Sequence, residues 1–348
     1  MKERKEFKFE PLDVGNFYHT VLDALLKTLN ARNKNFATVQ DQELLELLRE
    51  KISQLIQTHP FVSNFARRSA HNTYIINSAA EVLEDCVLAI AQMVRAGSFI
   101  PAKSEVAFGQ VEGARDTLGS YELTLSGNRV LSLDGKIDRL DIADVANEKL
   151  ALIFDYKRRE ESFNWSDLYY GLDMQLPIYM LAVRNASRSK IKNVVGAFYM
   201  PVEATIGQVA FDELENQKEK FPRKAKGIFD GEFFQQLDSA ANSGWSKFYS
   251  FCVTSKNQQY GDYGKSAALR PNDFEKVLQF TGTKILQLAG EIISGKIDAR
   301  PYRIGTQSPC TYCKFRAVCR FDWQINDYNS LESLDKLTVL ENIGAVNG

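Results

Sequence analysis

The sequence predicts an α/β fold in which a central mixed β-sheet is flanked by helices. Three observations lead to this prediction. Apolar residues follow a helical period from about residue 13 to 95, and then alternate or are β-branched from about 104 to 156. Helical and strand patterns alternate again further along the chain. A Rossmann fold is not expected, because no G-x-G-x-x-G motif follows the first strand pattern.

Three helices are expected before the sheet. The first starts near Asp13, and the second covers about 38–57, with Thr38 as its N-cap and Pro60 beyond its end. The third spans about 72–95. Its apolar stripe is wide, so this helix should be largely buried.

The strand patterns that follow form a meander. They cover 104–109, 117–127, 128–142 and 150–156. Residues 146–149, Ala-Asn-Glu-Lys, are typical of a turn, so the last two strands should pair as a hairpin.

Helices are expected again after the meander. One covers about 166–184, and a strand at 194–202 follows it. A longer helix should start with a capping box at Asn272 and Glu275 and end at Gly295. The tail from residue 301 is expected to be irregular.

Charge and hydropathy exclude several classes of protein. The 348 residues carry a formal net charge of −1, so any nucleic-acid binding would depend on local basic clusters. No apolar run approaches the roughly 20 residues of a membrane span, so no membrane partner is expected. The charged start, MKERKEFKFE, lacks the apolar core of a secretory signal. We therefore expect a cytoplasmic protein.

A pair of charged residues ends one predicted core strand, in LIFDYKRRE (152–160). Asp155 and Lys157 are two positions apart and so share a face. Asp138 lies on the preceding strand, and pairing across the turn would make the two carboxylates face each other. Close carboxylates repel unless a cation lies between them, and Mg²⁺ prefers oxygen ligands. Lys157 would then polarise an attacking water. The alternative is a set of solvated charges at a strand end.

The order of motifs resembles the RecB-type branch of the PD-(D/E)XK nucleases. That family has a histidine in an early helix, a G-x-x-D-R strand, a D-x-K strand and a Q-x-x-x-Y helix. The matching residues here are His19, Asp138, Asp155, Lys157, Gln175 and Tyr179. The resemblance implies a PD-(D/E)XK nuclease fold over residues 1–300 and Mg²⁺ or Mn²⁺ as cofactor.

The resemblance also implies roles for the site residues. His19, Asp138, Asp155 and the Tyr156 carbonyl would hold the metal. Lys157, Gln175 and Tyr179 would complete the catalytic site, and Gln175 and Tyr179 share a helix face because they are four residues apart. Glu105 is a candidate for a further acidic residue.

Two basic groups are candidates for DNA contacts. Arg158 and Arg159 follow the D-x-K motif directly. The second group is Lys218, Lys220, Arg223, Lys224 and Lys226, and its alternative is an ordinary solvated face. Because phosphate contacts carry no sequence information, little sequence preference is expected.

Three of the five cysteines cluster near the C-terminus. Cys310, Cys313 and Cys319 form C-x2-C-x5-C, but zinc and iron–sulfur sites normally need four ligands. A zinc-ribbon protein would therefore lack a ligand. Cys86 and Cys252 look like packed core residues.

The cysteine stretch resembles the C-terminal end of the AddB family, the second subunits of AddAB helicase–nucleases. In that family three late cysteines join a distant earlier one around a [4Fe-4S] cluster. The resemblance implies that this chain is a C-terminal fragment whose fourth ligand lies outside it, so we expect no intact cluster. Residues 301–348 would be a cysteine-containing extension packed on the nuclease domain.

The implied function is that of a bacterial DNA exonuclease. It would cut the 5′-ended strand during double-strand-break processing for recombinational repair, and an AddA-type partner would feed it single-stranded ends. The alternative is a catalytically idle module for DNA binding or assembly.

Overall fold

The central sheet of the protein has six strands. The computed structural model describes residues 11–113, 116–191, 193–204, 221–261 and 263–346. The strand order is β1-β4-β5-β6-β7-β11. These strands are β1 Ile100–Phe108, β4 Gly135–Val145, β5 Glu148–Lys157, β6 Asn193–Pro201, β7 Lys226–Asp230 and β11 Ala268–Leu269. Antiparallel pairs (β1/β4, β4/β5, β6/β7) combine with parallel ones (β5/β6, β7/β11), which confirms the predicted mixed sheet.

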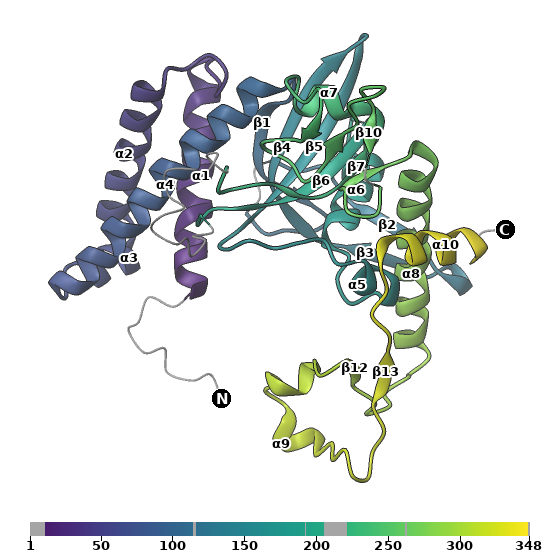
Figure 1. The fold of residues 1–348 in the computed structure, drawn as a ribbon. Coiled ribbons are helices and arrows are strands. Elements are labelled where there is room, and N and C mark those ends of the chain that lie inside the picture. Colours follow the sequence, from purple (N-terminus) through teal and green to yellow (C-terminus); the bar gives the residue numbers. More distant parts are fainter. Residues whose placement is uncertain (1–10, 114–115, 192, 205–220, 262, 347–348) are drawn as a thin grey trace, which may run out of the picture.

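Helices cover both faces of this sheet (Figure 1). One face packs against the N-terminal helices α1 Pro11–Ala31, α2 Asp41–Thr58, α3 Pro60–Ala66 and α4 Ala70–Ala96. The other face packs against α5 Trp165–Tyr170, α6 Gln175–Asn185 and α8 Pro271–Ile293. Each face has its own apolar core, because side chains alternate between the two sides of a strand. No helix in the described ranges is both long and apolar enough to cross a membrane.

The remaining elements lie outside the central sheet. They are β2 Tyr121–Thr124, β3 Val130–Leu133, α7 Phe234–Leu237, β8 Gly244–Trp245, β9 Cys252–Val253, β10 Tyr260–Gly261, β12 Tyr302–Ile304, α9 Arg316–Cys319, β13 Asn329–Leu331 and α10 Lys336–Val346. The pairs β2/β3 and β12/β13 form separate ladders, and β8, β9 and β10 form a small three-stranded sheet.

The predicted hairpin is confirmed. Strands β4 and β5 pair in antiparallel register, with Val145 opposite Glu148. Ala146 and Asn147 between them have φ values of 51° and 68°. Positive φ at both central residues is the signature of a type I′ turn, whose twist matches that of the flanking strands.

Two predicted helix starts are wrong. Helix α2 begins at Asp41 after Gln40, and Thr38 instead belongs to a turn in which its N–H donates to Asn35 Oδ1 (3.1 Å). Helix α8 begins after Arg270, with Pro271 in its first turn, so Asn272 lies inside the helix. A proline at the first helical position has no N–H to leave unpaired, and it therefore starts the helix without a capping box.

The predicted helix over 166–184 is broken in two. Gly171 adopts φ 77° and ends α5, and its N–H bonds to the Leu168 carbonyl. Asp173 Oδ1 then accepts the Gln175 N–H (2.9 Å), which starts α6. The prediction failed because the long apolar pattern hid a glycine C-cap followed at once by a new start. The break makes Gln175 the first residue of α6.

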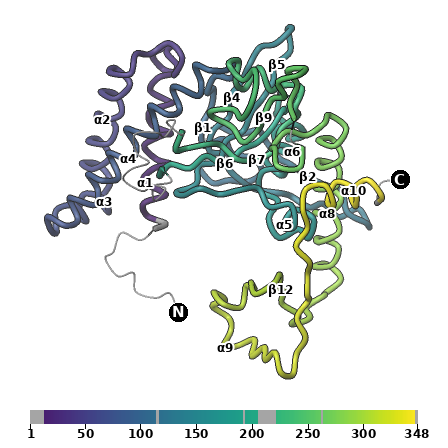
Figure 2. The backbone as a smooth tube through the Cα atoms, in the orientation of Figure 1, coloured from purple at the N-terminus to yellow at the C-terminus, as the bar shows by residue number. Residues whose placement is uncertain are grey.

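The tail is only partly irregular. The segment from β12 to β13 projects from the body of the molecule (Figure 2). The chain then returns: Leu334 bonds to Ser166 of α5, and α10 packs beside α8. Val339 and Ile343 of α10 are fully buried. Lys336, at the start of α10, is also buried, and its ammonium donates to the Ser266 and Ala268 carbonyls (2.8 and 2.7 Å).

Candidate active site

The β4–β5 hairpin brings the two predicted carboxylates together. Arg139 pairs with Phe154, so Asp138 and Asp155 lie one residue beyond this pair. The Tyr156 N–H donates to Asp138 Oδ2 (2.7 Å). Both carboxylates are almost fully buried. The two acidic groups therefore lie side by side and are separated by fewer than about 20 residues of chain. The tight turn between the strands sets the register that brings them together.

Two other elements, α1 and β1, join Asp138 of β4 in a group that has the composition of a metal site. His19 of α1 points its Nδ1 at Asp138 Oδ1 (3.2 Å) and at Glu105 Oε1 of β1 (3.6 Å). One potential ligand atom from each of these three residues lies within 4.8 Å of the others. One imidazole and two carboxylates form a donor set that suits a divalent cation such as Mn²⁺ or Mg²⁺.

An unusual backbone conformation gives Glu105 its position. Its φ is 51°, a left-handed conformation that is uncommon for a residue with a Cβ in a strand. The neighbouring residue Ser104 bonds to Asp23 of α1 (2.6 Å), while Val106 joins the core on the other face. Strain of this kind persists where the surrounding structure holds it, and it is frequent at functional sites.

Proton affinities in the group reflect the crowded charges. Burial would lower the pKa of His19, but its hydrogen bonds to Asp138 and Glu105 outweigh burial and raise that pKa to about 10. Burial and the charge of Asp138 raise the pKa of Asp155 to about 6, although Lys157 acts in the opposite direction. The clustered carboxylates therefore stabilise the positive charge of protonated His19.

Asp155 is held in a separate network. Lys157 Nζ contacts Asp155 Oδ2 (2.9 Å) and donates to Gln175 Oε1 (2.8 Å). The Gln175 amide donates in turn to Asp155 Oδ1 (2.8 Å) and to the Tyr179 hydroxyl oxygen (2.9 Å). Gln175 thus connects all of these residues and fixes the lysine next to the carboxylate.

One functional contributor was missed by sequence reasoning. Arg139 is completely buried; it donates to Asp141 (2.8 Å) and to the Tyr156 hydroxyl (3.1 Å), and its guanidinium lies 3.8 Å from the Phe154 ring centre. Since the Tyr156 N–H holds Asp138, this arginine supports the site from the opposite face of the sheet. The sequence signal that could have indicated this role is the position of Arg139 directly after Asp138 in GKIDRLD.

The expected DNA-contacting arginines already have acidic partners. Arg158 and Arg159 contact Glu203, at 3.3 and 3.6 Å. Of the second basic group, Lys218 and Lys220 lie outside the described residues. Arg158 is the more enclosed member of the first pair, whereas Arg159 is 77% exposed and remains accessible to a phosphate.

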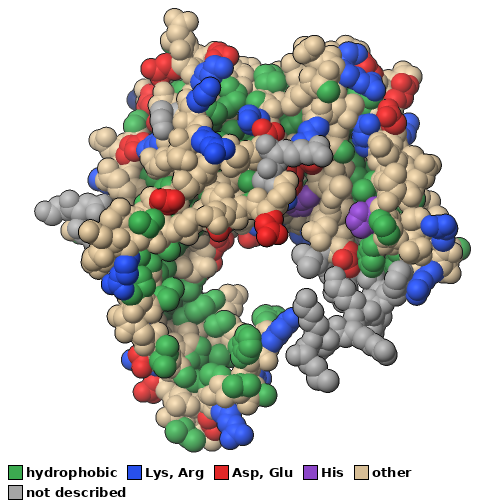
Figure 3. All heavy atoms as spheres, turned by 180° about the vertical axis from the view of Figure 1, so that it is seen from behind, with side chains coloured by type: hydrophobic (Ala, Val, Ile, Leu, Met, Phe, Trp, Pro, Cys, Tyr) green, Lys and Arg blue, Asp and Glu red, His purple; other side chains and the backbone are tan. Residues whose placement is uncertain are grey.

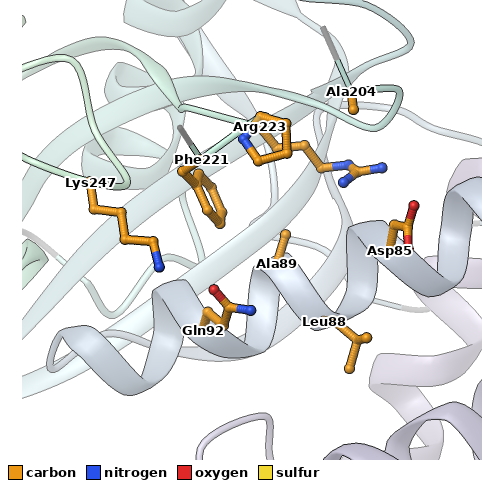
Figure 4. A pocket seen from close by; sticks show the side chains of 9 residues that line it. Asp85, Leu88, Ala89, Gln92, Ala204, Phe221, Arg223 and Lys247 are labelled. Atoms are coloured by element: carbon orange, nitrogen blue, oxygen red, sulfur yellow. The ribbon is translucent and has the colours of Figure 1, made fainter. Parts of the chain in front are cut away.

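Arg223 does not fit a phosphate-binding role. It is buried, and its guanidinium donates to the Val202 carbonyl (2.8 Å). Figure 4 shows it beside a pocket of about 390 Å³ that also borders Phe221, Lys247 and helix α4. Arg223 therefore has a structural role.

The three late cysteines lie together in the projecting segment. Cys310, Cys313 and Cys319 line a cavity of about 70 Å³, together with Arg316 and aromatic residues. Apolar side chains are widely exposed on this projecting part (Figure 3), including Tyr312, Phe315, Val318, Trp323 and Ile325.

No fourth thiol joins these cysteines among the residues that the structure describes. Cys86 is fully buried in α4, where burial raises its pKa to about 11, and Cys252 lies in β9. The cysteines of this chain therefore do not supply the four ligands that an iron–sulfur cluster normally requires. That no intact cluster forms in this chain remains a prediction.

The fold and the site define a class of protein. The chain matches the PD-(D/E)XK nuclease superfamily over residues 1–320, and it belongs to that family. Its relatives include proteins named as the B-type component of an ATP-dependent helicase/deoxyribonuclease, which agrees with the expected resemblance to AddB. Those from Thermoanaerobacter sp. (strain X514) and Clostridioides difficile (strain 630) are both 27% identical to it, over 92% and 100% of this chain.

The chain is short beside these relatives. The matched segments are 28% of the Thermoanaerobacter protein and 30% of the Clostridioides difficile protein. The protein from Bacillus cereus (strain ATCC 14579) is 25% identical over 99% of this chain, and again the match covers 30% of the relative. The chain thus spans less than a third of the length of these curated relatives.

Proposed function

We propose that this chain is a metal-dependent deoxyribonuclease domain that hydrolyses DNA phosphodiester bonds. The observation that carries the proposal is the placement of His19, Glu105 and Asp138 beside the Asp155–Lys157–Gln175 network. A cation site next to a fixed lysine is the arrangement needed to bind a phosphodiester and activate water. The names of the relatives support DNA as the substrate and a helicase–nuclease assembly as the context.

Each residue of the site has a separate role in this proposal. His19, Glu105 and Asp138 would hold a divalent cation, and Asp155 and the Tyr156 carbonyl would be further ligands. A bound Mg²⁺ or Mn²⁺ would supply charge stabilisation at the phosphate and a more acidic water. Lys157 orients the attacking water and stabilises negative charge that develops on the phosphate. Gln175 holds Lys157, and Tyr179 holds Gln175.

We infer that the domain degrades the 5′-ended strand during the processing of double-strand breaks, within an assembly that includes an AddA-type helicase–nuclease partner. The relatives' names, which combine helicase and deoxyribonuclease, support this context. Strand choice would follow from how the partner delivers DNA ends.

End-labelled DNA tests the activity and its polarity together. Single- and double-stranded oligonucleotides carrying a 5′ or a 3′ label are incubated with the chain and Mg²⁺, Mn²⁺ or EDTA. We expect degradation with either metal and none with EDTA, and the label that is released first reports the polarity. DNA binding without cleavage under all conditions would instead support an idle binding module.

Gln175→Ala is expected to lower the cleavage rate by about 10- to 100-fold, the usual effect of removing a residue that orients a metal-site group. The loss arises because Lys157 is no longer held against Asp155. Steady-state cleavage measures the effect, and Gln279→Ala on the exposed side of α8 is the matched control. An unchanged rate for Gln175→Ala would remove this residue from the site.

Metal binding is expected to release protons. Because hydrogen bonds to Asp138 and Glu105 hold the pKa of His19 at about 10, this imidazole is protonated at pH 8 and must lose its proton to ligate a cation. The apparent Mn²⁺ affinity should therefore rise by up to about tenfold per pH unit below pH 10. Calorimetry in buffers of different ionisation enthalpy counts the protons, and His19→Gln should abolish the release. Proton release that persists in that variant would assign it to another group.

A further inference from the structure

A cleft opens next to the candidate metal-ligand group His19, Glu105 and Asp138. Its volume is about 470 Å³, within the range of sites that hold small ligands. His19 and Glu105 are among its lining residues. The remaining lining residues are Gly15, Asn16, Thr20, Asp23 and Lys136.

Lys136 is the lysine that lines this cleft. Its side chain is half exposed, and its ammonium contacts the second carboxylate oxygen of Glu105. Asp23, the other acidic residue of the lining, already accepts from Ser104 (2.6 Å) and contacts Lys27 (2.8 Å). Glu105 is therefore the acidic residue of the lining that balances the charge of Lys136, and it is also a candidate metal ligand.

The two lysines near the candidate metal site face different surroundings. Lys157 is held on the α6 side by Asp155 and Gln175. Lys136 faces the cleft beside α1. If Glu105 ligated a cation, its attraction for Lys136 would weaken, and the ammonium would become available to another anion in the cleft.

We propose that this cleft is the subsite for the nucleotide adjacent to the scissile phosphate, and that Lys136 binds the phosphate of that nucleotide. The inference rests on the proposed nuclease function and adds a named substrate-binding residue to it. The metal charge and the Lys136 ammonium together attract the polyanionic DNA backbone to a cleft that otherwise carries acidic side chains.

The rest of the lining fits a nucleotide without reading its base. Asn16 and Thr20 lie one turn apart on α1 and are exposed. The Thr20 hydroxyl donates to the Asn16 carbonyl (2.7 Å), so its oxygen still has lone pairs for a sugar or base donor. One amide and one hydroxyl can bond to any nucleotide, so the subsite would accept all four bases.

Lys136→Gln tests the subsite. A fluorescent single-stranded oligonucleotide is titrated in Ca²⁺, a poor substitute for Mg²⁺ in hydrolysis because of its looser coordination. We expect about tenfold weaker binding, the usual effect of losing a charge-assisted bond, and a salt dependence that is shallower by about 0.7 in log–log slope, the value for one phosphate contact on a single strand. In Mg²⁺, KM should rise by about tenfold while kcat stays within about twofold.

Two further variants make the test specific. Lys136→Arg should restore binding and the salt slope, because it keeps the charge. Lys103→Gln is the matched control, since Lys103 also lies on the β1/β4 pair, is half exposed and contacts an acidic partner, Asp116 (3.0 Å), away from the cleft. It should behave as the parent.

The outcomes separate this inference from the proposed function. Equal salt slopes in the parent and Lys136→Gln would overturn the subsite, even if the parent cleaves DNA. A change in Mn²⁺ affinity with unchanged DNA binding would likewise overturn it, because Lys136 would then only balance the charge of Glu105. Failure of the parent to cleave DNA in any metal would refute the nuclease function itself.

Discussion

Asp138→Asn is expected to reduce the rate of DNA hydrolysis by more than about 100-fold, because loss of a direct ligand should exceed the 10- to 100-fold effect of an outer residue. The Asp138 carboxylate lies 3.2 Å from His19 and also accepts the Tyr156 N–H. An asparagine keeps the shape and can still accept that N–H through its amide oxygen. It loses the negative charge that would hold the cation, so activity should fall while the fold persists.

Asp144→Asn is the matched control for this prediction. Asp144 lies on the same strand, β4, is exposed, and pairs with Lys149 at the far end of the hairpin. It should cleave DNA as the parent does. Cleavage assays with Mg²⁺ and circular dichroism measure activity and folding separately. Equal activity in the parent and Asp138→Asn would remove this carboxylate from the proposed mechanism.

Arg139→Met is expected to lower the free energy of unfolding by about 3–5 kcal/mol, the usual cost of breaking a buried ion pair. Arg139 and Asp141 are both about 1% exposed, and the arginine also donates to the Tyr156 hydroxyl. Methionine fills part of the space but leaves the Asp141 carboxylate buried without its cation. Urea unfolding followed by fluorescence measures the change.

A double variant shows whether the cost comes from the orphaned charge. Arg139→Met combined with Asp141→Leu should recover most of the lost stability, because apolar residues of similar volume often replace a buried pair without loss. Arg184→Met removes a partly exposed pair with Glu275 and should cost at most about 1 kcal/mol. Similar losses in all three variants would contradict the interpretation that burial sets the cost.

The parts of the site that are local in sequence could be predicted. Asp138 and Asp155 lie on two strands joined by a two-residue turn, and pairing of these strands was enough to bring them together. Gln175 and Tyr179 are four apart on one helix and share a face as expected, and Gln175 donates to the Tyr179 hydroxyl. Short separations and fixed periods leave few alternative arrangements.

The parts that depend on tertiary packing could not be derived in the same way. Glu105 joins the candidate metal group through a positive φ, which no periodicity indicates. The role of Arg139 depends on aromatic rings and a carboxylate that converge on it from two strands. The division at Gly171 was visible in principle as a glycine cap, but the apolar pattern on either side concealed it.

His19 lies on α1, far along the chain from the hairpin, and this separation affects the order in which the site forms during folding. The hairpin carrying Asp138 and Asp155 can form early, because its strands are neighbours in the chain. His19 can reach it only after α1 has docked against β1. Closing so long a loop is expected to come late in folding. A partly folded chain would therefore have the acidic pair without its histidine. The complete cation site would appear only with the finished fold, which would protect DNA from an incompletely folded nuclease.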